Sequence, residues 1–147
     1  MHLDWRFDNP FTREFTVSAG HIDALGHTNN TIYSQWCEET AWAHSAALGM
    51  DAADYQRLNR AMAIQRAEYD YLLPSFAGET LLVGTWLTAM QRKLTMERCF
   101  QIFNRQTGSL LLQGKWQLVC IRIGTGKPVK MPTEFIQAYA PHIIRAG

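Results

Sequence analysis

One ten-residue segment, HIDALGHTNN at residues 21–30, is the most unusual stretch of the chain. It has neither helical nor strand periodicity, it contains a single carboxylate, Asp23, and it ends in residues that favour the start of a helix. A carboxylate can attack an electrophile directly or deprotonate a water, and the unpaired amides of a helix N-terminus favour an anion. The segment therefore predicts a nucleophile or general base next to an oxyanion site.

Each residue of this segment also has a purely structural interpretation. Asp23 can cap its own loop through an Asx turn, and Asn29 and Asn30 can serve as helix caps. His27 can orient Asp23 or a substrate, or it can form hydrogen bonds within the loop. Gly26 is expected to allow a positive φ or a close backbone approach.

A metal site and a cysteine nucleophile are two other interpretations of the same region. His21, Asp23 and His27 could converge on a metal ion, because His and carboxylate ligands at short spacing can meet on a loop. No recognised ligand series accompanies them, and the helix start explains the same residues, so we predict no metal. Cys37 falls in an apolar stripe, where burial raises a thiol pKa and disfavours nucleophilic chemistry.

The elements that must position these residues follow from periodicity and turn residues. Apolar rows at spacings of three and four predict a long helix between the caps at residues 29–31 and Gly49. Alternation and apolar runs predict strands, and Thr107-Gly108 predicts a hairpin turn. The strands are expected at residues 14–19, 63–71, 81–90, 94–103 and 110–123, and Pro74 and Gly78 should stop the second of them. A short helix capped by Asp51 is expected through residues 55–58, and another around residues 134–139.

This order of elements predicts an α+β fold. A helix that is apolar over most of its girth needs a sheet curved around it, so we expect about five antiparallel strands wrapped around one long central helix. The last three strands should form a meander.

The chain has 147 residues, a length that predicts a single domain over residues 1–147. The exposed sheet edge and apolar flank predict a homo-oligomer.

Composition excludes several classes of protein. Fourteen Lys and Arg residues against thirteen Asp and Glu residues give a net charge of +1, so no overall field favours nucleic acid or a membrane surface. The start of the chain resembles no signal peptide, and no apolar run is long enough for a membrane helix. The three cysteines are far apart and odd in number, which favours reduced thiols. We expect a cytoplasmic protein.

The run Asp23-Ala24-Leu25-Gly26-His27-Thr28-Asn29-Asn30-Thr31-Ile32-Tyr33, between a first strand and the long helix, resembles the signature of hotdog-fold acyl-CoA thioesterases. The 4-hydroxybenzoyl-CoA thioesterase superfamily is the most similar group. The continuation Tyr33-Ser34-Gln35-Trp36 with Glu38 and Glu39 also resembles acyl-carrier-protein thioesterases of that superfamily. His21 stands where many relatives carry an Asp, and Leu25 where the acyl-carrier-protein enzymes often carry an Asn.

The resemblance implies hydrolysis of acyl thioesters, with acyl-CoA or an acyl-carrier-protein thioester as substrate. It implies that the Asn30 amide polarises the thioester carbonyl, while Asp23 acts as nucleophile or general base. Arg92-Lys93 matches the position where relatives contact the phosphates of coenzyme A, although a turn also holds solvated charges. Tyr33, on the first helical turn, belongs either to the core or to the pocket.

The resemblance also implies a homodimer or homotetramer with its site between subunits, near the start of the long helix. Catalysis would need no cofactor, because coenzyme A enters as part of the substrate. The predicted catalytic residues are Asp23, Asn30 and His27, and the predicted substrate-binding residues are Gly26, Asn29, Tyr33, Arg92 and Lys93. A noncatalytic acyl-CoA or acyl-carrier binding module and a metal-dependent hydrolase are the alternatives. A hydratase would require a His and Glu pair in another motif, which the sequence lacks.

Overall fold

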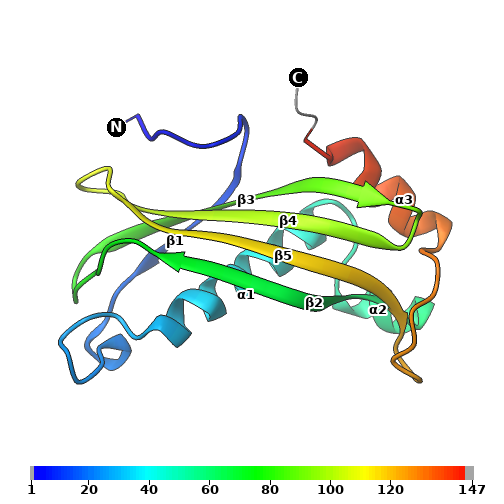
Figure 1. Ribbon diagram of the computed structural model, residues 1–147, viewed down its shortest axis with the longest axis horizontal. Helices are drawn as coiled ribbons and strands as arrows, with labels where there is room; N and C mark the ends of the chain where they lie inside the picture. The colour runs from blue at the N-terminus through cyan, green and yellow to red at the C-terminus, as the bar shows by residue number, and fades with distance from the viewer. Residues whose placement is uncertain (1, 145–147) are drawn as a thin grey trace. The chain divides into compact units, whose positions relative to one another are not determined.

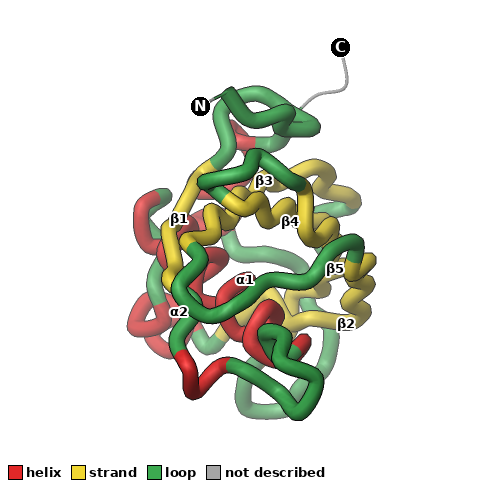
Figure 2. The backbone as a smooth tube through the Cα atoms, turned by 90° about the vertical axis from the view of Figure 1, so that its left-hand side faces the viewer, coloured by secondary structure: helices red, strands yellow, loops and turns green. Residues whose placement is uncertain are grey.

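The computed structural model describes residues 2–144, which form five strands, three α-helices and two short 3-10 helices (Figures 1 and 2). The strands are β1 (Phe11–Thr16), β2 (Arg60–Tyr71), β3 (Thr80–Gln91), β4 (Thr95–Asn104) and β5 (Leu110–Arg122). The helices are α1 (Asn30–Ala47), α2 (Ala52–Leu58) and α3 (Thr133–Tyr139), and the 3-10 helices are η1 (Ala19–His21) and η2 (Ala140–His142). No helix among the described residues is both long and apolar enough to cross a membrane.

The five strands form one curved antiparallel sheet in the order β1-β3-β4-β5-β2. The predicted meander of the last three strands is confirmed, because β3, β4 and β5 are neighbours in sequence and in the sheet. β1 pairs with β3 in a register that runs from Phe11 opposite Thr85 to Thr16 opposite Thr80. β1 and β2 are therefore the edge strands. The α+β fold class is as predicted, whereas a central position of the long helix stays a prediction.

The first predicted strand is wrong at its end. The alternation suggested a strand over residues 14–19, but β1 ends at Thr16 and η1 begins at Ala19. The Ser18 amide donates to His21 Nδ1 at 3.0 Å, and the His21 amide donates to the Ser18 carbonyl at 3.0 Å. These local hydrogen bonds compete with the hydrogen bonds between β1 and β3, and they turn the chain toward the polar segment at residues 21–30.

The helix boundaries follow the predicted caps. Asn29 Oδ1 accepts from the Thr31 amide at 3.0 Å at the start of α1, and Gly49 has a φ of 92° after its end. Asp51 caps α2 by accepting from the Asp54 amide at 2.9 Å. Each cap satisfies backbone groups that a helix terminus would otherwise leave unpaired.

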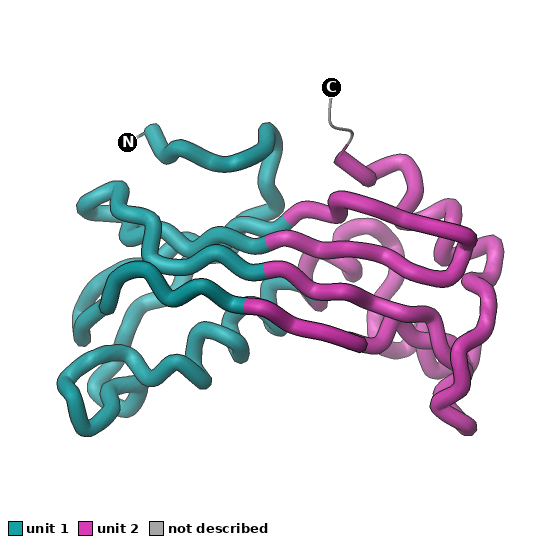
Figure 3. The backbone as a smooth tube through the Cα atoms, in the orientation of Figure 1, with its two compact units in different colours: residues 1–41, 69–85, 100–114 teal, residues 42–68, 86–99, 115–147 magenta. Residues whose placement is uncertain are grey.

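The described residues separate into two compact units (Figure 3). Within residues 2–144, the first unit comprises residues 2–41, 69–85 and 100–114, and the second comprises residues 42–68, 86–99 and 115–144. In the first unit the N-terminal segment lies on the sheet, where Trp5 packs so closely on Gly84 that a side chain there would collide with the ring. Cys37 is buried in the first unit, and Cys99 and Cys120 are buried in the second.

Candidate active site

The polar segment before α1 folds as a closed loop in the first unit. A β-bridge joins Ile22 to Thr28, and the Asp23 amide donates to the His27 carbonyl at 2.8 Å. Gly26 has a φ of 80°, and its amide donates to the Asp23 carbonyl at 3.1 Å. The conformational role predicted for Gly26 matches this geometry, because a positive φ is strained for residues with a Cβ.

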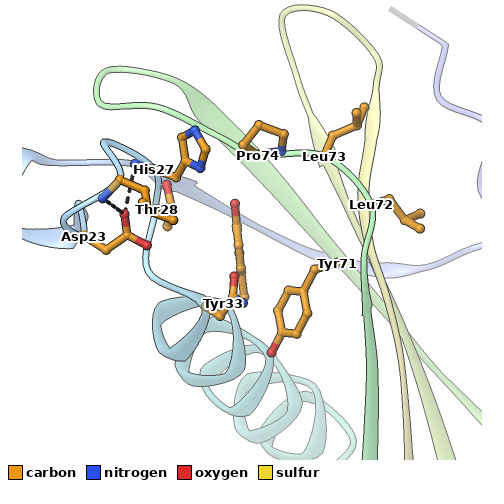
Figure 4. Close-up of a pocket in the computed structure, with 10 residues that line it drawn as sticks. Asp23, His27, Thr28, Tyr33, Tyr71, Leu72, Leu73 and Pro74 are labelled. Atoms are coloured by element: carbon orange, nitrogen blue, oxygen red, sulfur yellow. Dashed lines mark hydrogen bonds between the residues drawn. The ribbon is translucent and has the colours of Figure 1, made fainter.

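The Asp23 carboxylate is half-buried, and one of its oxygens holds the loop together. Oδ1 accepts from the Leu25 amide at 2.9 Å and from the His27 amide at 3.2 Å, as the dashed lines in Figure 4 show. These bonds form an Asx turn, the structural alternative that the sequence left open. Oδ2 has no hydrogen-bond partner within residues 2–144, so the carboxylate is fixed in place while one oxygen stays available for chemistry.

The first turn of α1 leaves one amide unpaired beside this loop. The Thr31 amide donates to Asn29 Oδ1, and the Ile32 amide donates to the Asn29 carbonyl at 2.9 Å. The Asn30 amide has no acceptor among the described residues. An unpaired amide at the positive end of a helix dipole binds a carbonyl oxygen that gains negative charge, which is the oxyanion role.

Asp23 and Asn30 line the same pocket, which has a volume of about 250 Å³. Figure 4 shows Asp23 on one side of this pocket and Tyr71 on the other. One wall comes from the loop and the start of α1, and the other from the end of β2 and the segment after it. All lining residues belong to the first unit. They are Asp23, Leu25, His27, Thr28, Asn30, Tyr33, Tyr71, Leu72, Leu73 and Pro74.

The mouth of the pocket is unusually apolar for an exposed surface. Leu25 is 78% exposed, and Tyr71, Leu72, Leu73 and Phe76 are each about half exposed. Exposed apolar side chains that gather around a pocket favour a ligand or a partner chain at that place.

Two predicted site residues, His27 and Tyr33, make structural contacts and also line the pocket. His27 contacts the Asp23 carboxylate through its backbone amide, and its ring packs edge-on against Phe76, with 5.3 Å between ring centroids. Tyr33 is 3% exposed and still lines the pocket, so it belongs to both core and pocket. Its hydroxyl lies 2.6 Å from Ser75 Oγ.

The basic pair belongs to the second unit, so the pocket of the first unit does not contain it. Arg92 and Lys93 are exposed at the turn between β3 and β4, with φ values of 56° and 52°. A two-residue turn with both residues in the left-handed region matches the twist of the flanking strands, although it normally selects Asn and Gly. The Met131 amide donates to the Lys93 carbonyl at 2.7 Å and braces this turn.

The metal site and the cysteine nucleophile are the other two interpretations of this region. Among residues 2–144, no three His, Cys, Asp or Glu side chains gather closely enough to hold a metal ion. His21 Nδ1 is engaged by Ser18, as described above. Burial raises the pKa of Cys37, as expected for a structural thiol.

Sequence reasoning missed the second wall of the pocket. Leu72, Leu73 and Pro74 follow the alternating β2 strand as an apolar run, and Ser75 next to them is completely buried. In the sequence, Pro74 indicates only the end of the strand expected at residues 63–71. Two adjacent leucines before a proline, outside any periodic element, were the available signal of an exposed apolar wall.

Comparisons with known proteins agree with this architecture. The model of the thioesterase-like superfamily matches residues 17–139. No curated protein matches the sequence. Among solved structures, the chain is similar to a 1,4-dihydroxy-2-naphthoyl-CoA thioesterase from Synechocystis, with a TM-score of 0.80 and 20% identity over 90% of this chain and 96% of that chain.

Two further structures are similar in fold. A hypothetical protein from Staphylococcus aureus in complex with CoA has a TM-score of 0.83 and 15% identity, over 95% of this chain and 89% of that chain. A 12:0-ACP thioesterase from Umbellularia californica has a TM-score of 0.81 and 18% identity, over 92% of this chain and 51% of that chain. At these identities the structural likeness shows a shared fold.

Proposed function

The chain belongs to the thioesterase-like superfamily and has the predicted hotdog fold, and from this premise we propose that it hydrolyses acyl-CoA thioesters in the pocket of the first unit. One observation carries the proposal. A carboxylate oxygen of Asp23 and the helix-start amide of Asn30, both without a hydrogen-bond partner in the described chain, line one pocket.

The chemistry follows from these two groups. The thioester carbonyl oxygen accepts a hydrogen bond from the Asn30 amide, which stabilises the negative charge that develops there. Asp23 Oδ2 either attacks the carbonyl carbon to give a mixed anhydride, which water then hydrolyses, or deprotonates a water that attacks. The thiol, with a pKa near 8.5, leaves as a thiolate without a strong acid. The products are the free acid and coenzyme A.

The remaining predicted residues support this reaction. Gly26 and the His27 amide hold the Asp23 carboxylate in its turn, Asn29 caps the helix that presents the Asn30 amide, and Tyr33 forms part of the pocket wall. Arg92 and Lys93 would bind coenzyme A phosphates, and the CoA complex of a structural neighbour supports this choice of carrier. The reaction scheme uses no metal or cofactor.

We further propose that the protein works as a homodimer or a larger even-numbered oligomer. β2 is an edge strand with Ile64 exposed, and the apolar mouth of the pocket lies directly after this strand. A second copy would cover both surfaces and enclose the acyl group. Light scattering at micromolar concentration should give an even multiple of the monomer mass. A monomer with full thioesterase activity would refute the shared site.

An acyl-carrier protein is the second candidate carrier, because a structural neighbour is a 12:0-ACP thioesterase. The two carriers present the same acyl thioester. They differ in the group attached beyond the phosphate, which is a nucleotide in coenzyme A and a protein in the acyl-carrier protein. The same acyl group presented on each carrier separates them by kcat/KM.

The deciding experiment is a thiol-release assay with short, medium, long and aromatic acyl-CoA substrates. We expect release of coenzyme A with at least one of these classes, and unchanged rates after treatment with a chelator. Binding of acyl-CoA without any thiol release would favour the noncatalytic module. Loss of activity with chelator, restored by a divalent metal, would favour the metal-dependent hydrolase.

A further inference from the structure

A buried hydroxyl cluster lies directly behind the pocket. Ser75 is 0% exposed, and its Oγ lies 2.7 Å from Thr28 Oγ1 and 2.6 Å from Tyr33 Oη. The Ser75 carbonyl accepts from the Thr28 amide at 2.9 Å and from Thr28 Oγ1 at 3.2 Å. We call Thr28, Tyr33 and Ser75 the Ser75 cluster.

The protons of the cluster can be assigned without conflict. Thr28 Oγ1 donates to the Ser75 carbonyl, so it accepts from Ser75 Oγ. Ser75 Oγ then accepts from Tyr33 Oη. Each hydroxyl donates once, and a buried hydrogen-bond chain that is fully satisfied holds its members in one geometry.

The cluster joins the two elements that carry the proposed reactive groups. Thr28 closes the loop through its bridge to Ile22, and this loop carries Asp23. Tyr33 lies in the first turn of α1, the turn that presents the Asn30 amide. Ser75, which follows the second wall of the pocket, is bonded to both.

We propose that Ser75 is a positioning residue that sets the separation between the Asp23 carboxylate and the Asn30 amide. The inference rests on the proposed function and adds a residue to it. A displacement of about 1 Å between reacting groups can lower a rate about a hundredfold, so a clamp of this kind acts on kcat. Ser75 is completely buried and does not line the pocket, so we expect KM to stay the same.

The test compares Ser75→Ala with Ser45→Ala. Ser45 is also buried, and its Oγ lies 2.7 Å from Tyr139 Oη, but it belongs to the second unit and to no part of the proposed site. Both variants lose one buried hydroxyl and should lose similar thermal stability. We expect kcat to fall about tenfold to a hundredfold for Ser75→Ala with KM unchanged, and to stay near wild type for Ser45→Ala.

A second pair of variants keeps the test valid if Ser75→Ala fails to fold. Thr28→Val removes the hydroxyl and keeps the shape of the side chain, whereas Thr28→Ser keeps the hydroxyl. We expect a lower kcat for Thr28→Val and recovery in Thr28→Ser. Equal kcat in these two variants, or a wild-type kcat in folded Ser75→Ala, would overturn the positioning role.

A parallel measurement of Asp23→Asn separates this inference from the proposed function. Loss of activity in Asp23→Asn with full kcat in Ser75→Ala would refute only the role of Ser75. Full activity in Asp23→Asn would refute the proposed chemistry, and with it the separation that Ser75 is inferred to set.

Discussion

Each compact unit buries a hydroxyl cluster, and the two clusters are built alike. In each, a central hydroxyl lies between two others at distances of 2.5 to 2.7 Å. The first is the Ser75 cluster, and the second, the Tyr139 cluster, consists of Ser45, Tyr55 and Tyr139. No buried side-chain nitrogen or oxygen among the described residues lacks a hydrogen-bond partner, so both clusters stabilise a fixed local geometry.

The two clusters differ in their surroundings. The Ser75 cluster lies behind a pocket where Asp23 Oδ2 and the Asn30 amide have no partner in the described chain. In the same unit as the Tyr139 cluster, buried Arg98 has Nη1 2.9 Å from His44 Nδ1. Burial lowers the pKa of Arg98 to about 10 and raises the pKa of Tyr55. Similar hydrogen-bond chains thus support proposed chemistry in one unit and stability in the other.

The largest expected effect is on the chemistry of the first unit. Asp23→Asn keeps the size of the side chain and an oxygen for the Leu25 and His27 amides, but it removes the charge. General-base catalysis contributes about 10² to 10⁴ in rate, so kcat should fall at least about a hundredfold. Thermal stability and acyl-CoA affinity should change little. A folded variant that keeps more than about a tenth of wild-type kcat would exclude Asp23.

Acid should weaken the second unit. Burial, followed by the positive charges of Arg98 and His142, lowers the pKa of His44 from 6.5 to about 4. Between these values the unfolded chain binds a proton at His44 that the folded chain does not, so stability falls as the pH falls from about 6.5 to about 4. After a discount for the exposed part of the ring, we expect a loss of about 1 to 2 kcal/mol.

The measurement for this second prediction is urea unfolding of wild type and His44→Gln at several pH values. Carboxylates also titrate near pH 4, so the difference between the two proteins isolates the His44 contribution. The difference in the free energy of unfolding between wild type and His44→Gln should change with pH only between about 6.5 and about 4. A difference that is constant from pH 7 to pH 4 would contradict a neutral, half-buried His44.

The smallest effect is expected from Arg92 and Lys93, whose replacement tests whether the second unit also binds substrate. Replacing Arg92 and Lys93 by Ala should raise KM for acyl-CoA about threefold to tenfold, because each lost charge weakens a phosphate contact. Hydrolysis of a short thioester without the nucleotide should be unchanged. The matched control is Arg57→Ala with Arg66→Ala, which also removes two exposed cations from the second unit. Equal losses on both substrates would indicate a structural role for the turn.

Helices and most strands could be predicted because their signals are local. The Asn29 and Gly49 caps indicate the bounds of α1, and Asp51 indicates the start of α2. Alternation, apolar runs and the Thr107-Gly108 turn indicate the meander. The end of β1 was missed because a hydrogen bond between neighbouring residues, from the Ser18 amide to the His21 ring, replaced the strand ladder. Periodicity alone does not report such a competing bond.

The sequence by itself located the residues proposed to react, because Asp23 and Asn30 lie seven positions apart in one loop and helix start. Tertiary structure decided what surrounds them. Ser75 reaches Thr28 and Tyr33 across 47 and 42 residues of chain. The Leu72–Pro74 wall, which follows β2, lines the same pocket as the loop. Local propensities carry no information about which distant segments meet, because such contacts form only when the sheet and helix pack together.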